Sequence, residues 1–146
     1  MKRTRVAGLI EIENGYALMH RKNVKKREGT TAPYGEYFVF PGGGVEEDDI
    51  SFEEAVKREV LEELGIEIEV IRELYYRKIN EELDEYLYLC KFISGIFGTG
   101  KGPEFSNDSR YLDRGEYYAE IISKDLIKDI NLYPKEFKEK IIKDFL

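Results

Sequence analysis

The sequence predicts a single-domain α/β protein in which strands and helices alternate along one chain. Its 146 residues are the usual length of one domain. Hydrophobic residues make up 42% and charged residues 36% of the chain, which is typical of a soluble globular protein and not of a disordered one. Short segments rich in Ile, Val and Tyr favour strands, and segments with capping signals favour helices. We therefore treat residues 1–146 as one folded unit.

The first predicted element is a β-hairpin. Residues 7–13 and 16–20 are largely apolar and flank Asn14-Gly15, a pair suited to the positive φ angles of a two-residue turn. A basic, glycine-containing loop is expected to follow, from about residue 22 to residue 33.

A short buried strand and a capped helix are predicted next. Residues 37–40 are apolar, and Pro41 with the three glycines after it ends the strand. Ser51 begins the helix, because Glu54 three residues later completes a capping box. Gly65 is placed to end this helix at its C-terminal cap.

The second half of the chain is predicted to hold three strands and two helices. Residues 66–79 and 85–97 are expected to form an antiparallel pair, and a long polar loop follows from residue 98 to about 114. The remaining elements are a strand at 117–122, a short helix from Lys124 capped by Ser123, and a final helix that starts at Pro134.

The composition excludes several kinds of site. Cys90 is the only cysteine and His20 the only histidine, which argues against an intrachain disulfide, a thiolate metal cluster and a histidine-based zinc site. We interpret both residues as structural members of strands. The chemistry of this chain is therefore expected to depend on carboxylates.

The net charge of −7 disfavours nonspecific binding to nucleic acid, because such binding depends on Lys and Arg that neutralise phosphates. A phosphorylated small molecule is repelled by the same charge unless a divalent metal intervenes. The apolar stretch after the basic N-terminus ends at Glu11, too soon for a signal peptide or a membrane span. We expect a cytoplasmic protein without membrane contact, as a monomer or a small oligomer such as a homodimer.

Three glutamates gather on one side of the predicted helix. Glu59, Glu62 and Glu63 are three and four residues apart, so their side chains share a narrow arc. Like charges at this spacing repel by roughly 0.2–0.5 kcal/mol per exposed pair, and Mg²⁺ or Mn²⁺ would relieve that repulsion. Three such glutamates alone are more often a solvated helix face. Here they follow a strand, a glycine-led loop and a capped helix start, which favours a metal site.

The stretch over residues 42–66 resembles the signature of the Nudix hydrolase family (MutT-like). That signature is a glycine-led loop followed by a helix that reads Arg-Glu-apolar-any-Glu-Glu-any-Gly-apolar, and residues 58–66 match the helix half completely. The resemblance implies an α/β/α sandwich with a mixed β-sheet. It also implies metal-dependent hydrolysis of the phosphoanhydride bond in a nucleoside diphosphate linked to another group.

The resemblance also implies roles for single residues. Arg58 orients the glutamates, and Gly43 and Gly44 let the backbone approach the metal and the phosphates. The implied ligands of Mg²⁺ or Mn²⁺ are the carboxylates of Glu59, Glu62 and Glu63 and the carbonyl of Gly42. One position departs from the family pattern: Ile50 stands where the family carries a glutamate, eight positions before the arginine. The loop is one residue longer, and Asp49 is the nearest substitute for that acid.

The general base and the substrate are less closely defined. The base is either one of the three helix glutamates or an acid elsewhere, for which Glu104, Glu116 and Glu120 are candidates. Arg21 and the basic residues after it are candidates for binding terminal phosphates of a nucleotide-like small molecule. Tyr34, Tyr37 and Tyr118 are candidates for stacking on a base, although tyrosines beside strands usually serve packing.

Two alternatives come from other functional classes. A Nudix-like domain can bind a nucleotide as a sensor without catalysis, but sensors usually lack some of the glutamates or carry a DNA-binding domain. A non-enzymatic acidic interaction domain leaves the capped glutamate helix unexplained. The sequence therefore favours a pyrophosphohydrolase.

Overall fold

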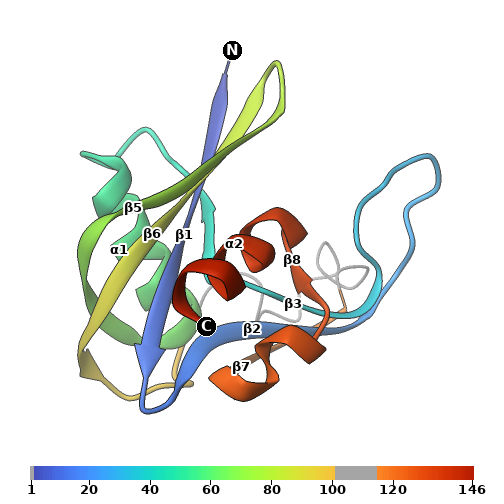
Figure 1. Ribbon diagram of the computed structural model, residues 1–146. Helices are drawn as coiled ribbons and strands as arrows, with labels where there is room; N and C mark the ends of the chain where they lie inside the picture. The colour runs from blue at the N-terminus through green and yellow to red at the C-terminus, as the bar shows by residue number, and fades with distance from the viewer. Residues whose placement is uncertain (1, 101–114) are drawn as a thin grey trace.

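The computed structural model of the chain describes residues 2–100 and 115–146. These residues fold around one curled sheet with a few helices (Figure 1). Along the chain the elements are β1 (Arg3–Ile12), β2 (Gly15–Val24), β3 (Gly35–Val39), β4 (Gly42–Gly44), α1 (Phe52–Leu64), β5 (Ile66–Asn80), β6 (Leu83–Gly95), β7 (Glu116–Ser123), the 3₁₀ helix η3 (Lys124–Asp129), β8 (Leu132–Tyr133) and α2 (Lys135–Phe145).

The sheet is mixed, as the sequence resemblance implies. Its strand order is β5-β6-β1-β2-β3-β8, with β4 paired to β1 and β7 paired to β2. The β1–β6 and β3–β8 pairs are parallel, and the other pairs are antiparallel. β1 and β2 pair only beside their turn, where Glu11 lies opposite Tyr16 and Ile12 opposite Gly15. Beyond that point β1 pairs with β4 and β2 pairs with β3, so the sheet divides into two halves.

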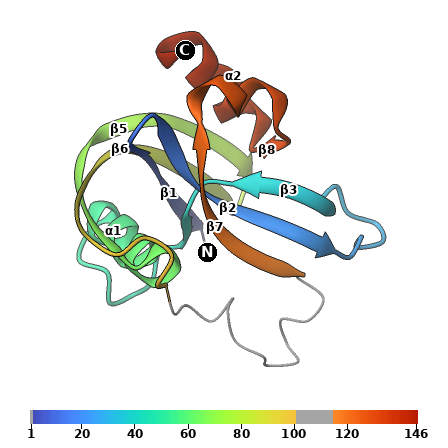
Figure 2. The same cartoon turned by 90° about the horizontal axis from the view of Figure 1, so that it is seen from below.

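Helices cover both faces of the sheet, which gives the expected three layers (Figure 2). The core on one face joins α1 to alternate residues of the strands, among them Ala17 and Met19 of β2. The core on the other face joins η3 and α2 to the intervening residues, among them Tyr16 and Leu18. This alternation identifies the face to which each residue of β2 belongs. In the described residues, no helix combines the length and the apolar character needed to cross a membrane.

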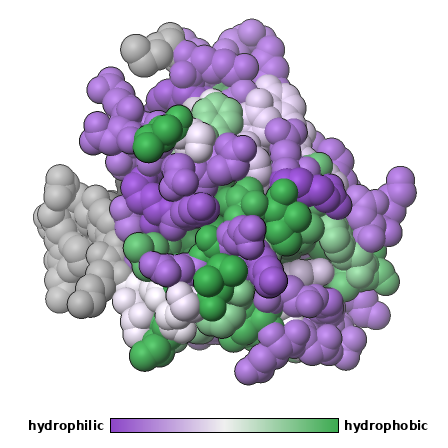
Figure 3. All heavy atoms as spheres, turned by 90° about the vertical axis from the view of Figure 1, so that its left-hand side faces the viewer, coloured by the Kyte–Doolittle hydropathy of each residue, from purple (hydrophilic) through white to green (hydrophobic). Residues whose placement is uncertain are grey.

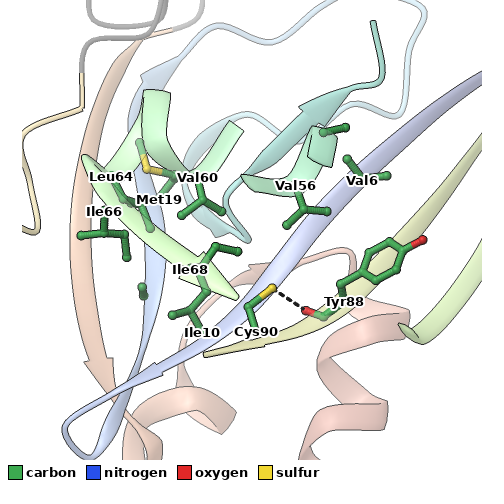
Figure 4. Packing of buried hydrophobic residues seen from close by; sticks show 12 residues of the cluster. Val6, Ile10, Met19, Val56, Val60, Leu64, Ile66, Ile68, Tyr88 and Cys90 are labelled. Atoms are coloured by element: carbon green, nitrogen blue, oxygen red, sulfur yellow. Dashed lines mark hydrogen bonds between the residues drawn. The ribbon is translucent and has the colours of Figure 1, made fainter. Parts of the chain in front are cut away.

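Helix α1 is positioned by its caps and by its apolar side. The Ser51 side chain accepts a hydrogen bond from the Glu54 backbone N–H at 3.1 Å, and Gly65 adopts the left-handed conformation that ends the helix. Its fully buried residues Val56, Val60 and Leu64 pack on the sheet (Figure 4). In the same core the Cys90 thiol donates a hydrogen bond to the Tyr88 carbonyl. The two caps predicted for this helix are therefore confirmed.

The first turn differs from its prediction by one residue. The turn consists of Glu13 and Asn14, with Glu13 at a φ of 58°, and Gly15 already belongs to β2. The reason is the close approach of β7: a Cβ on Gly15 would lie 2.5 Å from the Ile122 carbonyl oxygen. The glycine is therefore needed for strand packing rather than for the turn.

Other boundaries also differ from the prediction. The three glycines after Pro41 form the short strand β4 and not a turn, because they pair with Arg5–Ala7 of β1. Pro134 is the N-cap of α2 and the helix begins at Lys135. Ser123 makes no side-chain cap to η3. The predicted loop at 98–114 lies mostly outside the described residues.

The surface formed by α1, β5 and β6 mixes apolar and hydrophilic side chains (Figure 3). Leu61 is 49% exposed although it lies on the same helix as the fully buried Leu64. The same substitution can therefore be compared at an exposed position, Leu61, and at a buried position, Leu64.

We expect Leu64→Ala to lower the free energy of unfolding by about 2–5 kcal/mol, because it removes buried methyl groups and leaves a cavity. Leu61→Ala should change it by less than about 0.5 kcal/mol, as is usual for a surface substitution. Urea unfolding followed by circular dichroism measures both values. Equal losses in the two variants would contradict the packing of α1 described above.

Candidate functional site

Two of the predicted carboxylates are buried between α1 and β4. Glu59 is 8% exposed and Glu63 is 5% exposed, whereas most glutamates in proteins remain in water. They lie four residues apart on α1, so both side chains leave the helix on the side that faces β4. The backbone N–H of Gly42 donates a hydrogen bond of 3.0 Å to Oε1 of Glu63. The helix and the glycine strand thus meet through these carboxylates.

The glycines of β4 allow this close contact. A Cβ on Gly43 would lie 2.6 Å from Cδ of Glu59 and 2.6 Å from its Oε1, closer than real Cβ atoms approach such groups. Any side chain at this position would displace the Glu59 carboxylate. Gly43 therefore matters for its lack of a side chain, as the sequence predicts for an approach of backbone to the site.

Alternate residues of β4 face β1 and α1. The Pro41 carbonyl accepts from Gly8 on β1, whereas the Gly42 N–H donates to Glu63 and the Gly44 carbonyl accepts from Arg58 at 3.1 Å. The N–H and C=O of one strand residue point to the same edge. The Gly42 carbonyl, the predicted metal ligand, therefore lies on the edge that faces α1.

Arg58 is the centre of the hydrogen bonds in this region. Its Nε and Nη2 donate to the two carboxylate oxygens of Asp49, both at 2.9 Å, in the two-pronged geometry that arginine favours. Its Nη1 donates to Oε1 of Glu59 at 2.9 Å and lies 3.5 Å from both oxygens of Glu62. Nη1 is also 3.6 Å from Glu46. One guanidinium thus connects the loop, the helix and β4.

Asp49, the nearest substitute for the glutamate that the family carries at the next position, lies against Arg58. Ile50 is 93% exposed, whereas the Asp49 side chain is 6% exposed against Arg58. Hydrogen bonds from Arg58, together with one from the Glu46 backbone N–H, lower the pKa of Asp49 and outweigh the effect of burial, which alone would raise it. The hydrogen bond to Asp49 also raises the pKa of Arg58, so this pair stays charged.

The local charge is strongly negative. Four acids lie within 4 Å of the Arg58 guanidinium, namely Glu46, Asp49, Glu59 and Glu62, and a fifth, Glu63, accepts from Gly42. In residues 2–100 and 115–146, no three His, Cys, Asp or Glu side chains are arranged so that they could hold a metal ion. The donor chemistry nevertheless fits Mg²⁺ or Mn²⁺, because two carboxylates of this set are buried beside a glycine backbone and carboxylate oxygen is the preferred ligand of these ions.

Arg21 lies on the sheet face that α1 covers. It follows His20 in β2 and pairs across the strands with Tyr37 of β3 and Tyr117 of β7. Its guanidinium carbon is 5.3 Å from the centre of the Tyr37 ring and 4.2 Å from that of Tyr117. These aromatic contacts fix the direction of the arginine. The structure therefore brings Arg21 to the face that carries the glutamates.

Glu120 lies on the opposite face. It pairs with Leu18, which belongs to the α2 core, and its Oε1 is 2.8 Å from Nδ1 of His20. The structure thus separates Glu120 from the carboxylates of α1. Glu116, the other candidate on β7, binds Asn23 and Tyr118. Glu104 lies outside the described residues.

Sequence reasoning missed part of this arrangement. The two carboxylates beside His20 belong to strands far apart in sequence, and their spacing carries no motif. The hydrogen bond from Gly42 to Glu63 was also not anticipated, although the glycines pointed to a close approach. Asp49 was identified only as a substitute for a family residue, and its contact with Arg58 emerges from the fold.

The chain is similar to proteins of one family. The family model described as the NUDIX domain matches residues 1–121. No curated protein matches the chain.

Solved structures give a consistent picture. The chain is 26% identical to MutT NUDIX hydrolase from Burkholderia pseudomallei, covering 86% of this chain and 85% of that chain with a TM-score of 0.60. It is 17% identical to MutT from a comparison of Aliivibrio salmonicida and Vibrio cholerae, covering 98% of both chains with a TM-score of 0.66. It is 20% identical to an ADP-ribose pyrophosphatase from Streptococcus suis, covering 91% and 81% with a TM-score of 0.59. The latter two likenesses show a shared fold.

We expect Asp49→Asn to lower the free energy of unfolding by about 1–3 kcal/mol, because Arg58 loses a charged partner. Asp48→Asn is the matched control, since Asp48 is exposed on the same loop. Chemical unfolding at pH 7 measures the difference.

The pH dependence has a defined sign. Because folding lowers the pKa of Asp49, its contribution is complete above its ordinary value of about 3.9 and is lost as the pH falls through the lower folded value. The difference between wild type and Asp49→Asn should therefore shrink under strong acid. A difference that grew under acid would contradict the assigned ion pair.

Proposed function

The chain belongs to the NUDIX family and is a Nudix hydrolase, and from this premise we propose that it cleaves the phosphoanhydride bond of a nucleoside diphosphate linked to another group, using Mg²⁺ or Mn²⁺. The observation that carries the proposal is the placement of Glu59 and Glu63 against the glycine strand, with Arg58 bound to the first of them. Three carboxylates from one helical turn supply the oxygen ligands that such a reaction needs.

We assign the metal to the acidic side of α1. The carboxylates of Glu59, Glu62 and Glu63, together with the Gly42 carbonyl, would hold it. A bound divalent cation supplies neutralisation of the phosphoryl oxygens and eases the ionisation of water, which are the main requirements of phosphoanhydride hydrolysis. The number of acids near Arg58 supports this assignment, because neighbouring carboxylates repel one another and a divalent cation relieves that repulsion.

The residues around the metal ligands have supporting roles. Arg58 holds Glu59 in one orientation and ties the loop to the helix through Asp49. Gly43 and Gly44 keep the edge of β4 open toward the phosphates, since neither carries a side chain there. Glu63 is oriented by the Gly42 N–H. Together these contacts fix the ligand carboxylates before substrate arrives.

The general base is assigned to the three helix glutamates and not to Glu120. A base must reach the attacking water, and Glu120 points away from α1 toward His20. Glu120 instead contacts His20 of β2 from β7, the strand that also carries Tyr117. Glu104 remains a candidate from the sequence.

The substrate is placed on the α1-facing side of β2, β3 and β7. Arg21 supplies a positive group there, directed by Tyr37 and Tyr117, and a phosphate of the substrate is its proposed partner. The similar structures named above include an ADP-ribose pyrophosphatase and MutT, and another is a UDP-X diphosphatase. These names support a nucleotide-like small molecule as the substrate class.

The test is a panel of diphosphate-containing compounds incubated with Mg²⁺ or Mn²⁺ and scored by the products formed. We expect Glu62→Gln and Glu63→Gln to lower turnover by about 10²-fold or more without unfolding the protein. Glu54→Gln is the matched control, because Glu54 is exposed on the same helix.

Metal binding is measured separately by thermal unfolding. Mg²⁺ should raise the Tm of wild type and of Glu54→Gln, and it should raise the Tm of Glu62→Gln and Glu63→Gln less. Full activity in both of the latter variants would refute the assignment. Release of no product from any compound, with Mg²⁺ binding intact, would favour the sensor alternative.

We expect Arg21→Lys to raise KM by about tenfold and to change kcat less, because lysine keeps the charge but not the planar fork. Arg72→Lys, at an exposed position of β5 outside the basic loop, is the control and should leave KM within about twofold. Steady-state kinetics on the substrate found in the panel gives both values. An unchanged KM in Arg21→Lys would exclude a phosphate contact by this residue.

A further inference from the structure

His20 makes polar contacts at both ends of its ring. Its Nδ1 is 2.8 Å from Oε1 of Glu120, and its Nε2 is 2.6 Å from Oε2 of Glu36. The imidazole is 8% exposed and stacks on Phe38 with a centroid distance of 4.0 Å and an interplanar angle of 16°. A buried ring held on three sides has a fixed position. The proposed hydrolysis does not use this residue.

The two carboxylates come from strands that do not pair with each other. β3 and β7 flank β2, and His20 lies opposite Phe38 on one side and Tyr118 on the other. Glu36 is near the start of β3, and Glu120 is in the middle of β7. The ring therefore connects the two outer strands across the central one. We call this the His20 link, made of His20, Glu36 and Glu120.

The opposite face of the same three strands carries the proposed substrate side. Residue 21 follows residue 20, so the Arg21 side chain leaves β2 on the other face. Tyr37 and Tyr117, which direct it, follow Glu36 in β3 and precede Tyr118 in β7. The His20 link on one face and the two tyrosines on the other thus belong to the same three strands, which are paired through their backbones.

The His20 link depends on protons. An ionised carboxylate only accepts hydrogen bonds, so both contacts are hydrogen bonds only when both ring nitrogens carry a proton. A neutral imidazole has only one N–H. The lone pair of its other nitrogen would then face a carboxylate, and no hydrogen bond would form there. The charged groups that face the ring are Glu36 from β3 and Glu120 from β7. Farther along the same face, Lys22 of β2 lies over the Tyr118 ring, and the Tyr118 hydroxyl donates to Glu116.

We propose that His20 is a positioning residue, which ties β3 to β7 through Glu36 and Glu120 and so steadies Tyr37 and Tyr117 around Arg21. The kinetic part of the inference rests on the proposed function. The part on the hydrogen bonds of the ring concerns the free protein alone.

The first experiment tests the free protein. Because His20 is the only histidine, long-range ¹H–¹⁵N NMR of the imidazole yields one set of signals. We expect the signals of both ring nitrogens to show a hydrogen bond to a carboxylate, with one of them changed in Glu36→Gln and the other changed in Glu120→Gln. Ring signals that are the same in wild type and in both variants would overturn the proposal.

The second experiment separates positioning from general stability. We expect Glu120→Gln to raise KM about threefold to tenfold with a smaller change in kcat. Glu116→Gln is the matched control on the same strand and should change KM less than about twofold, because Glu116 binds Asn23 and Tyr118 and not His20. His20→Gln should raise KM to a similar extent as Glu120→Gln.

The outcomes are distinguishable. If His20→Gln fails to fold, Glu36→Gln provides the same comparison, since the Glu36 side chain is 61% exposed and its loss leaves the core intact. If no compound in the panel is hydrolysed, the proposed function fails while the NMR measurement still decides the hydrogen bonds of the ring. A KM that is the same in wild type, His20→Gln and Glu120→Gln would refute the positioning role.

Discussion

The approach of α1 to β4 is the constraint on which the rest of this molecule depends. Packing of the helix on the sheet brings Glu63 to the Gly42 N–H and Glu59 against Gly43, where no space is left for a side chain. Arg58 then connects the helix to the loop before it through Asp49. Helix, loop and strand are thereby fixed as one unit, and a change in any of them moves the carboxylates.

This arrangement keeps local electrostatic repulsion inside a stable fold. Burial of Glu59 and Glu63 is unfavourable, and one guanidinium offsets only part of the surrounding negative charge. Local rules are commonly broken at functional sites, where the fold elsewhere compensates. Here the compensation comes from the apolar side of α1, whose buried residues anchor the helix whatever its acidic side binds. Stability and chemistry are therefore assigned to opposite sides of one helix.

The sequence was sufficient where the signals were local. Ser51 and Gly65 marked the ends of α1 because capping depends on a few neighbouring residues, and the glutamate spacing located the acidic side of the helix. Features made by distant segments were not predictable in this way. The role of Gly15 depends on a strand from the other end of the chain, and the contacts of His20 join three strands that no spacing relates. The overall layers were predicted through a family resemblance and not through periodicity.

The burial of Cys90 has a consequence for following the protein in solution. Exclusion of water raises the pKa of its thiol to about 12, so the nucleophilic thiolate is scarce while the core is closed. Alkylation of this single sulfur is then limited by excursions in which α1 lifts from the sheet. The rate of labelling at Cys90 therefore reports how often the core opens.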